Sequence, residues 1–102
     1  MNLDQLEKER QKYIEVAKKR VLTDQEIARR NAIEWALRNR NKSLEQLRKE
    51  TNRLYAAMKR LQQGRERDTD FDLLVTALHA ANAQEAKIAL SERYNLLKQL
   101  AE

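Results

Sequence analysis

Cysteine and proline are absent from this sequence, and glycine and histidine occur once each. Without cysteine the chain has no disulfide, no thiol nucleophile and no thiolate metal ligand. No apolar run approaches the roughly 20 residues of a membrane span, so we expect no membrane partner. Residues 1–10 include five charged side chains and no signal-peptide core, and we expect a cytoplasmic location.

The residue types that are present favour helices throughout. Alanine, leucine, glutamate, lysine, glutamine and arginine dominate, and all are strong helix formers. No alternating apolar run bounded by turn residues indicates a strand. The sequence therefore predicts an all-α protein, and 102 residues fit a single domain over 1–102.

Boundary signals predict three helices, over residues 3–21, 24–63 and 70–101. Thr23 and Glu26 form a Thr-x-x-Glu capping box, which begins the second helix sharply. The third helix is expected to begin with a cap near residue 70.

The second predicted helix has a firm end and a weak middle. Gly64 is a natural stop, because glycine readily adopts the left-handed conformation that follows a helix. Residues 39–43 contain two asparagines and a serine, which are poor mid-helix residues. Ser43 and Gln46 form a second capping-box pair, so the segment is either one helix or two.

Apolar or neutral residues recur along the second helix at steps of three and four. They are Ile33, Leu37, Leu44, Leu47, Thr51, Leu54, Met58 and Leu61. Such a 3-4 repeat is typical of a coiled-coil-like seam, with Arg40 as a polar residue within it. We expect an antiparallel helical hairpin, or a three-helix bundle, built around one long central helix.

Positive charge is concentrated in the middle of the chain. Residues 24–67 hold twelve basic and six acidic side chains, a net charge of +6, whereas residues 68–102 hold three basic and six acidic, a net charge of −3. Two interpretations follow: the two segments pack on each other, or the basic one meets an external anion.

Opposite the seam, the central helix presents a row of cations and one tryptophan. The row is Trp35, Arg38, Lys42, Lys49, Arg53, Lys59 and Arg60. Such a row could neutralise the phosphates of a nucleic acid or an anionic partner, and equally could keep a leucine-rich helix soluble. Trp35 is placed on this outward face, where it either contacts a ligand or packs the first helix or a second subunit.

Catalytic signals are weak. His79 is the only histidine, and no carboxylate lies at helical spacing from it. Asp68, Asp70 and Asp72 alternate like a calcium loop, but Leu73 stands where that loop needs its glycine. We therefore expect no enzyme, no cofactor, no metal site and no small-molecule substrate.

Residues 43–64 resemble the helix-turn-helix of Cro- and repressor-type regulators. The positions that carry the resemblance are Leu47, Thr51, Asn52, Met58, Leu61 and Gly64. The chain departs from that family at Lys42, Arg48 and Arg53, where the family has apolar or small residues. The resemblance implies a turn near Asn52, with Tyr55, Ala56 and Lys59 facing the major groove of DNA.

Two functions are expected from these observations. The first is a small interaction protein of adaptor, chaperone or inhibitor type that forms a homodimer or docks on a partner protein. Its expected contacts are Leu44, Leu47, Leu54, Met58, Leu61, Leu90, Tyr94 and Leu97. The alternative for these residues is the protein's own core. The second function is nucleic-acid binding, through the helix-turn-helix or through the basic face.

Overall fold

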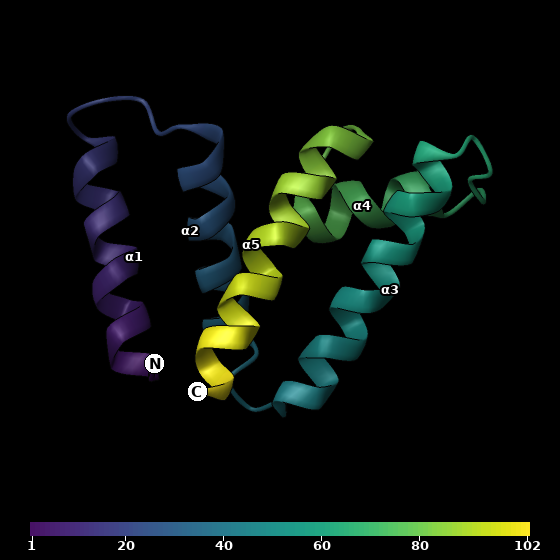
Figure 1. Ribbon diagram of the computed structural model, residues 1–102. Helices are drawn as coiled ribbons and strands as arrows, with labels where there is room; N and C mark the ends of the chain where they lie inside the picture. Colours follow the sequence, from purple (N-terminus) through teal and green to yellow (C-terminus); the bar gives the residue numbers. More distant parts are fainter.

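The computed structural model describes all 102 residues and consists of five α-helices without strands (Figure 1). The helices are α1 (Leu3–Ala17), α2 (Asp24–Arg38), α3 (Leu44–Gln62), α4 (Asp70–Leu78) and α5 (Ala83–Ala101). The all-α prediction is confirmed, and the chain is compact, with a radius of gyration of 14.0 Å. The helices number five rather than three because two predicted helices are interrupted.

The predicted central helix is divided into α2 and α3. Asn39 ends α2 and donates a side-chain hydrogen bond of 2.7 Å to the Trp35 carbonyl. Ser43 begins α3 with a full capping box: its hydroxyl accepts from the Gln46 N–H, and the Gln46 side chain accepts from the Ser43 N–H. The chain reverses between these caps, so the long seam does not form and Arg40 lies in an exposed turn.

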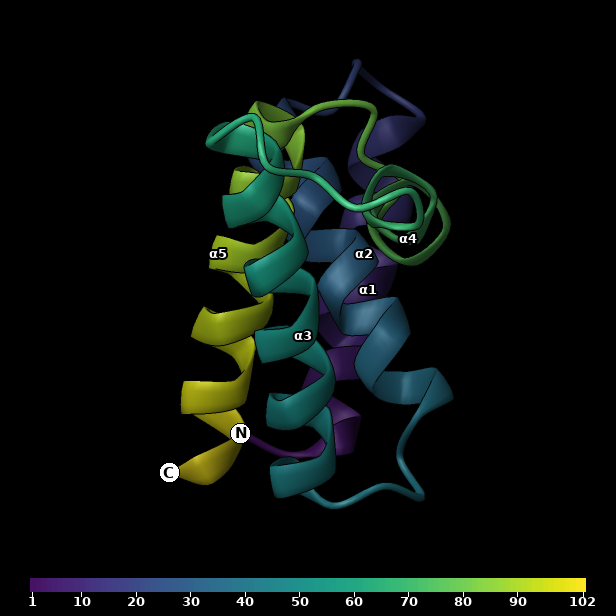
Figure 2. The ribbon, with the colours of Figure 1, turned by 90° about the vertical axis from the view of Figure 1, so that its right-hand side faces the viewer.

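The predicted third helix is also divided, which corrects a prediction that contained no break there. α4 ends at His79, which has a left-handed φ of 56°. Asn82 then caps α5 by accepting a hydrogen bond of 2.9 Å from the Glu85 N–H. The resulting short helix α4 crosses α3 and α5, and Figure 2 views it nearly along its axis.

Helix α5 lies between α2 and α3 and packs against both (Figure 1). Its two halves enter two separate apolar clusters. One cluster comprises Leu6, Ala32, Ile33, Trp35, Ala36, Leu37, Leu47, Leu96 and Leu97. The other comprises Leu54, Ala57, Met58, Leu74, Leu78, Ala80, Ala86 and Leu90. Burial of this apolar area is the main stabilising contribution, and α5 is the element that links the two clusters.

Helix α1 is joined to the rest by a nearly buried arginine. Arg29 of α2 donates to both carboxylate oxygens of Glu9, at 2.6 and 3.0 Å, and to the Gln99 side chain of α5 at 2.7 Å. The hydrogen bonds from Arg29 lower the pKa of Glu9. Three helices are thus fixed by one guanidinium group.

The loop before α4 is anchored by Asp70. Its carboxylate accepts two hydrogen bonds of 2.8 Å from Arg60 and one of 2.8 Å from the Arg67 N–H. Asp70 is 2% exposed. The Arg60 guanidinium and the Arg67 N–H hold the pKa of Asp70 well below its usual range, so the residue stays ionised in the folded protein.

Replacing Asp70 with asparagine should therefore lower the free energy of unfolding at pH 7. The difference from the parent should shrink as the pH falls below about 4, the ordinary carboxyl pKa, because the carboxyl is then protonated in the unfolded parent and must lose that proton when the protein folds. Urea denaturation at pH 7 and at pH 2.5 measures this difference. Asp68→Asn, at an exposed residue two positions away, is the control and should change little. A difference that is equal at both pH values would contradict the account.

Candidate functional site

The residues predicted to contact a partner mostly fill the protein's own core. Leu47, Leu54, Met58, Leu90 and Leu97 are each less than 5% exposed within the two clusters. Of the remaining three, Leu44 is exposed, and Leu61 and Tyr94 are half-buried. In the folded chain, therefore, the residues of the predicted seam present no continuous apolar surface to a second protein.

Trp35 is buried, and its predicted outward position is wrong. It is 2% exposed. Its indole N–H donates to Glu50 at 3.2 Å, and the Arg93 guanidinium stacks 4.1 Å from its ring centre. Burial lowers the pKa of Arg93 to about 10. Trp35 packs α2 against α3 and α5, whereas the packing alternative raised for it named the first helix or a second subunit.

The predicted row of cations is not a single row. Arg60 is bound to Asp70, and Lys42 lies 3.5 Å from Glu50. Arg38 belongs to α2, beyond the turn that separates the two helices. Lys49 lies 3.5 Å from Glu45, so the exposed cations of the row that remain on α3 without an ion-pair partner are Arg53 and Lys59.

The helix-turn-helix resemblance does not extend to the structure. α3 is one unbroken helix from Leu44 to Gln62, and Asn52 lies in its middle where the family requires a turn. Thr51 is buried, and its hydroxyl donates to the Leu47 carbonyl one turn earlier, at 2.8 Å. The heptad-like spacing of the matching residues thus reflects a single amphipathic helix.

The structure instead brings together two polar stripes from α3 and α5, which lie side by side and antiparallel (Figures 1 and 2). Each stripe repeats at steps of four, three and four residues, which keeps its members on one side of a helix. We call the combined surface the α3–α5 face. It consists of Arg48, Asn52, Tyr55 and Lys59 from α3, with Lys87, Ser91, Tyr94 and Lys98 from α5.

The α3–α5 face carries four cations and no carboxylate. All four cations are exposed, and none lies within ion-pair distance of an acidic group. Arg53 adds to the positive surface of α3, whereas Lys49 lies 3.5 Å from Glu45. Sequence reasoning missed Arg48, Lys87 and Lys98: the four-three-four spacing on α5 is visible in the sequence, but its position beside α3 depends on the fold.

The acidic residues of α3 and α5 point elsewhere or lie at the helix ends. Glu50 and Glu92 both accept hydrogen bonds from side chains of α2. Glu45 and Glu85 are in the first turns of their helices, where carboxylates suit the helix dipole, and Glu102 follows α5. Glu45 pairs with Lys49 at 3.5 Å, and none of these carboxylates lies within ion-pair distance of the four cations of the α3–α5 face.

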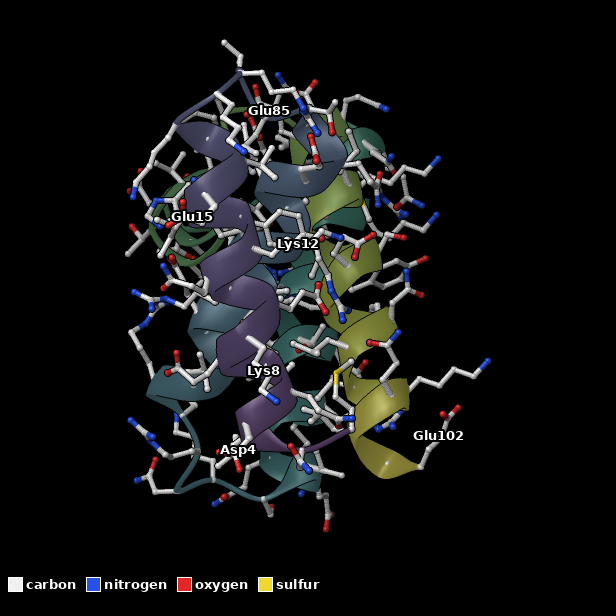
Figure 3. The ribbon with its side chains drawn as sticks, turned by 90° about the vertical axis from the view of Figure 1, so that its left-hand side faces the viewer. Asp4, Lys8, Lys12, Glu15, Glu85 and Glu102 are labelled. Atoms are coloured by element: carbon white, nitrogen blue, oxygen red, sulfur yellow. The ribbon has the colours of Figure 1, made fainter.

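The outer surface of α1 provides a contrast. Asp4, Lys8, Lys12 and Glu15 project from it, so that two cations lie between two carboxylates (Figure 3). Such a mixed surface is what solubility alone requires. The excess of cations over carboxylates is therefore specific to the α3–α5 face.

Two tyrosines lie in the middle of the α3–α5 face. The rings of Tyr55 and Tyr94 meet edge to face, with centres 6.2 Å apart. The Tyr94 hydroxyl donates to the Asn52 side chain at 2.6 Å, and the Lys59 ammonium lies 5.8 Å from the Tyr55 ring centre. Partial burial raises the pKa of Tyr94, which keeps its hydroxyl protonated as a donor.

No three histidine, aspartate or glutamate side chains are grouped as metal ligands would be. A polar depression of about 580 Å³ between α1, α2 and α5 is lined by Glu26, Arg29 and Glu92, all of which are engaged with other side chains. None of the five helices combines the length and the apolarity needed to cross a membrane.

Comparisons of this chain with protein families, with curated proteins and with solved structures find no match. The functional interpretation therefore depends on the geometry of the α3–α5 face.

Because Trp35 is the only tryptophan, intrinsic fluorescence reports on its burial. Iodide should quench the native protein far less than the urea-unfolded protein. Trp35→Ala should lower the free energy of unfolding by about 3–5 kcal/mol, and Trp35→Phe, which keeps a ring for Arg93, by less. Equal quenching of the native and unfolded states would contradict the position described for Trp35.

Proposed function

We propose that the protein is a non-enzymatic nucleic-acid-binding protein whose α3–α5 face contacts the sugar-phosphate backbone. The observation that carries the proposal is the set of four exposed, unpaired cations on a surface without carboxylates. A cytoplasmic location is proposed with it.

The physical basis is the release of counterions from a polyanion. Each phosphate that a lysine or arginine neutralises adds a salt-dependent contribution to binding. Arg48 and Lys59 are eleven residues apart, a distance of about 17 Å along α3 at 1.5 Å per residue. Lys87 and Lys98 have the same separation on α5, so the face can contact several phosphates at once.

A protein partner is the second candidate, and one observation favours it. Phe71 and Val75, one turn apart on α4, are 46% and 39% exposed. Exposed apolar side chains that adjoin each other mark interaction sites when the patch is large. Sedimentation of the protein alone tests self-association: a dimer that Phe71→Ser dissociates would support this candidate, and a monomer at all concentrations would remove the homodimer.

The nucleic-acid proposal is tested with two matched triple variants. One replaces Lys59, Lys87 and Lys98 of the α3–α5 face with glutamine. The control replaces three other exposed lysines, Lys8, Lys12 and Lys19, with glutamine. Both variants lose the same net charge, so only the position of the charge differs.

Binding of fluorescein-labelled 20-nucleotide strands and duplexes is followed by anisotropy between 50 and 200 mM salt, as an order-of-magnitude working range. The face variant should bind at least about tenfold more weakly at roughly 100 mM salt, and its slope of log affinity against log salt should fall by about two. The control should keep nearly the parent affinity. Equal losses in both variants, or no binding by the parent at the lowest salt, would overturn the proposal.

A further inference from the structure

Tyr55 is an exposed aromatic side chain at the centre of the α3–α5 face. It is 41% exposed, although a tyrosine of a small helical protein could have been buried in either apolar cluster. Arg48 lies two turns before it on α3 and Lys59 one turn after it. An aromatic ring flanked by cations at helical spacing is an arrangement that suits a base and its neighbouring phosphates.

The ring of Tyr55 is held in place by its neighbours. Tyr94 packs against it edge to face and is itself fixed by its hydrogen bond to Asn52. The Lys59 ammonium lies 5.8 Å from the ring centre on a flexible side chain, so it can move to a phosphate when a base stacks on the ring. Because these contacts restrict the side chain before any ligand arrives, less conformational entropy is lost on binding than for a free surface tyrosine.

The width of the α3–α5 face argues against recognition of the bases of a duplex. A recognition helix enters the major groove alone, because that groove is about 12 Å wide. The α3–α5 face is formed by two helices side by side, each about 10–12 Å across with axes about 8–10 Å apart, and is therefore roughly 20 Å wide. Duplex phosphates can reach its cations, but duplex bases remain stacked inside and cannot reach Tyr55.

We infer that the α3–α5 face binds single-stranded nucleic acid, with one base stacked on Tyr55 and the adjacent phosphates on the four cations. This inference rests on the proposed function and narrows it to one class of ligand. The stacked base adds affinity that a duplex cannot gain, and it does so with little sequence preference because every base has an aromatic face.

The first test compares Tyr55→Ala and Tyr55→Phe with the parent on 20-nucleotide RNA and DNA strands and on the DNA duplex, at one salt concentration. The parent should prefer the single strands. Tyr55→Ala should lose about 5- to 100-fold in single-strand affinity and little for the duplex. Tyr55→Phe, which keeps the ring, should retain most of the affinity. Thermal melting of each variant checks that the fold is intact.

A second measurement needs no protein variant. A DNA strand of the same length with abasic sites in place of its bases keeps the phosphates and removes the stacking partner. The parent should bind it more weakly than the ordinary strand, by a factor similar to the loss caused by Tyr55→Ala. The RNA and DNA arms show whether the sugar contributes; a preference for either one is compatible with the inference.

The outcomes distinguish this inference from the proposed function on which it rests. If the lysine variants of the α3–α5 face weaken binding while Tyr55→Ala and the abasic strand have no effect, the face binds phosphate and the stacking inference is wrong. Preference of the parent for the duplex would also overturn the inference. If the lysine variants have no effect, nucleic-acid binding through this face fails as a whole.

Discussion

The packing of α5 between α2 and α3 is the constraint on which the rest of the structure depends. Its C-terminal half supplies Leu96 and Leu97 to one apolar cluster, and its N-terminal half supplies Ala86 and Leu90 to the other. Because the same helix serves both clusters, α3 is held antiparallel to it along most of its length. The outward sides of α3 and α5 then form one surface.

That packing explains why much of the fold could be predicted and why some of it could not. Composition and capping pairs predict the helical class and the starts of α2 and α3, because these depend on local chemistry. The apolar repeat runs in phase through the turn at residues 39–43, since α2 and α3 both bury a side against α5. Periodicity alone could not distinguish this from one long helix, whereas the Ser43 cap could.

The residues of the candidate site were harder to predict because their positions depend on how pairs of helices pack. Trp35 lies opposite the predicted seam, yet α5 and its Arg93 cover it from that side. The sequence predicts Arg60 as a free cation of the basic row, but in the structure it forms an ion pair with Asp70. Conversely, Lys87 and Lys98 join the cations of α3 in one surface only because α5 packs beside α3. Sequence identifies candidate cations, and the tertiary structure decides which remain unpaired.

The central claim is that the α3–α5 face is where nucleic acid binds, and amide chemical shifts of ¹⁵N-labelled protein locate the bound ligand most directly. On titration with a short single strand, the largest shifts should occur in residues 48–59 of α3 and 87–98 of α5. The amides around Lys8 and Lys12 on the mixed-charge surface of α1 should change little. Shifts concentrated on α1 or α4, or absent throughout the titration, would contradict the account.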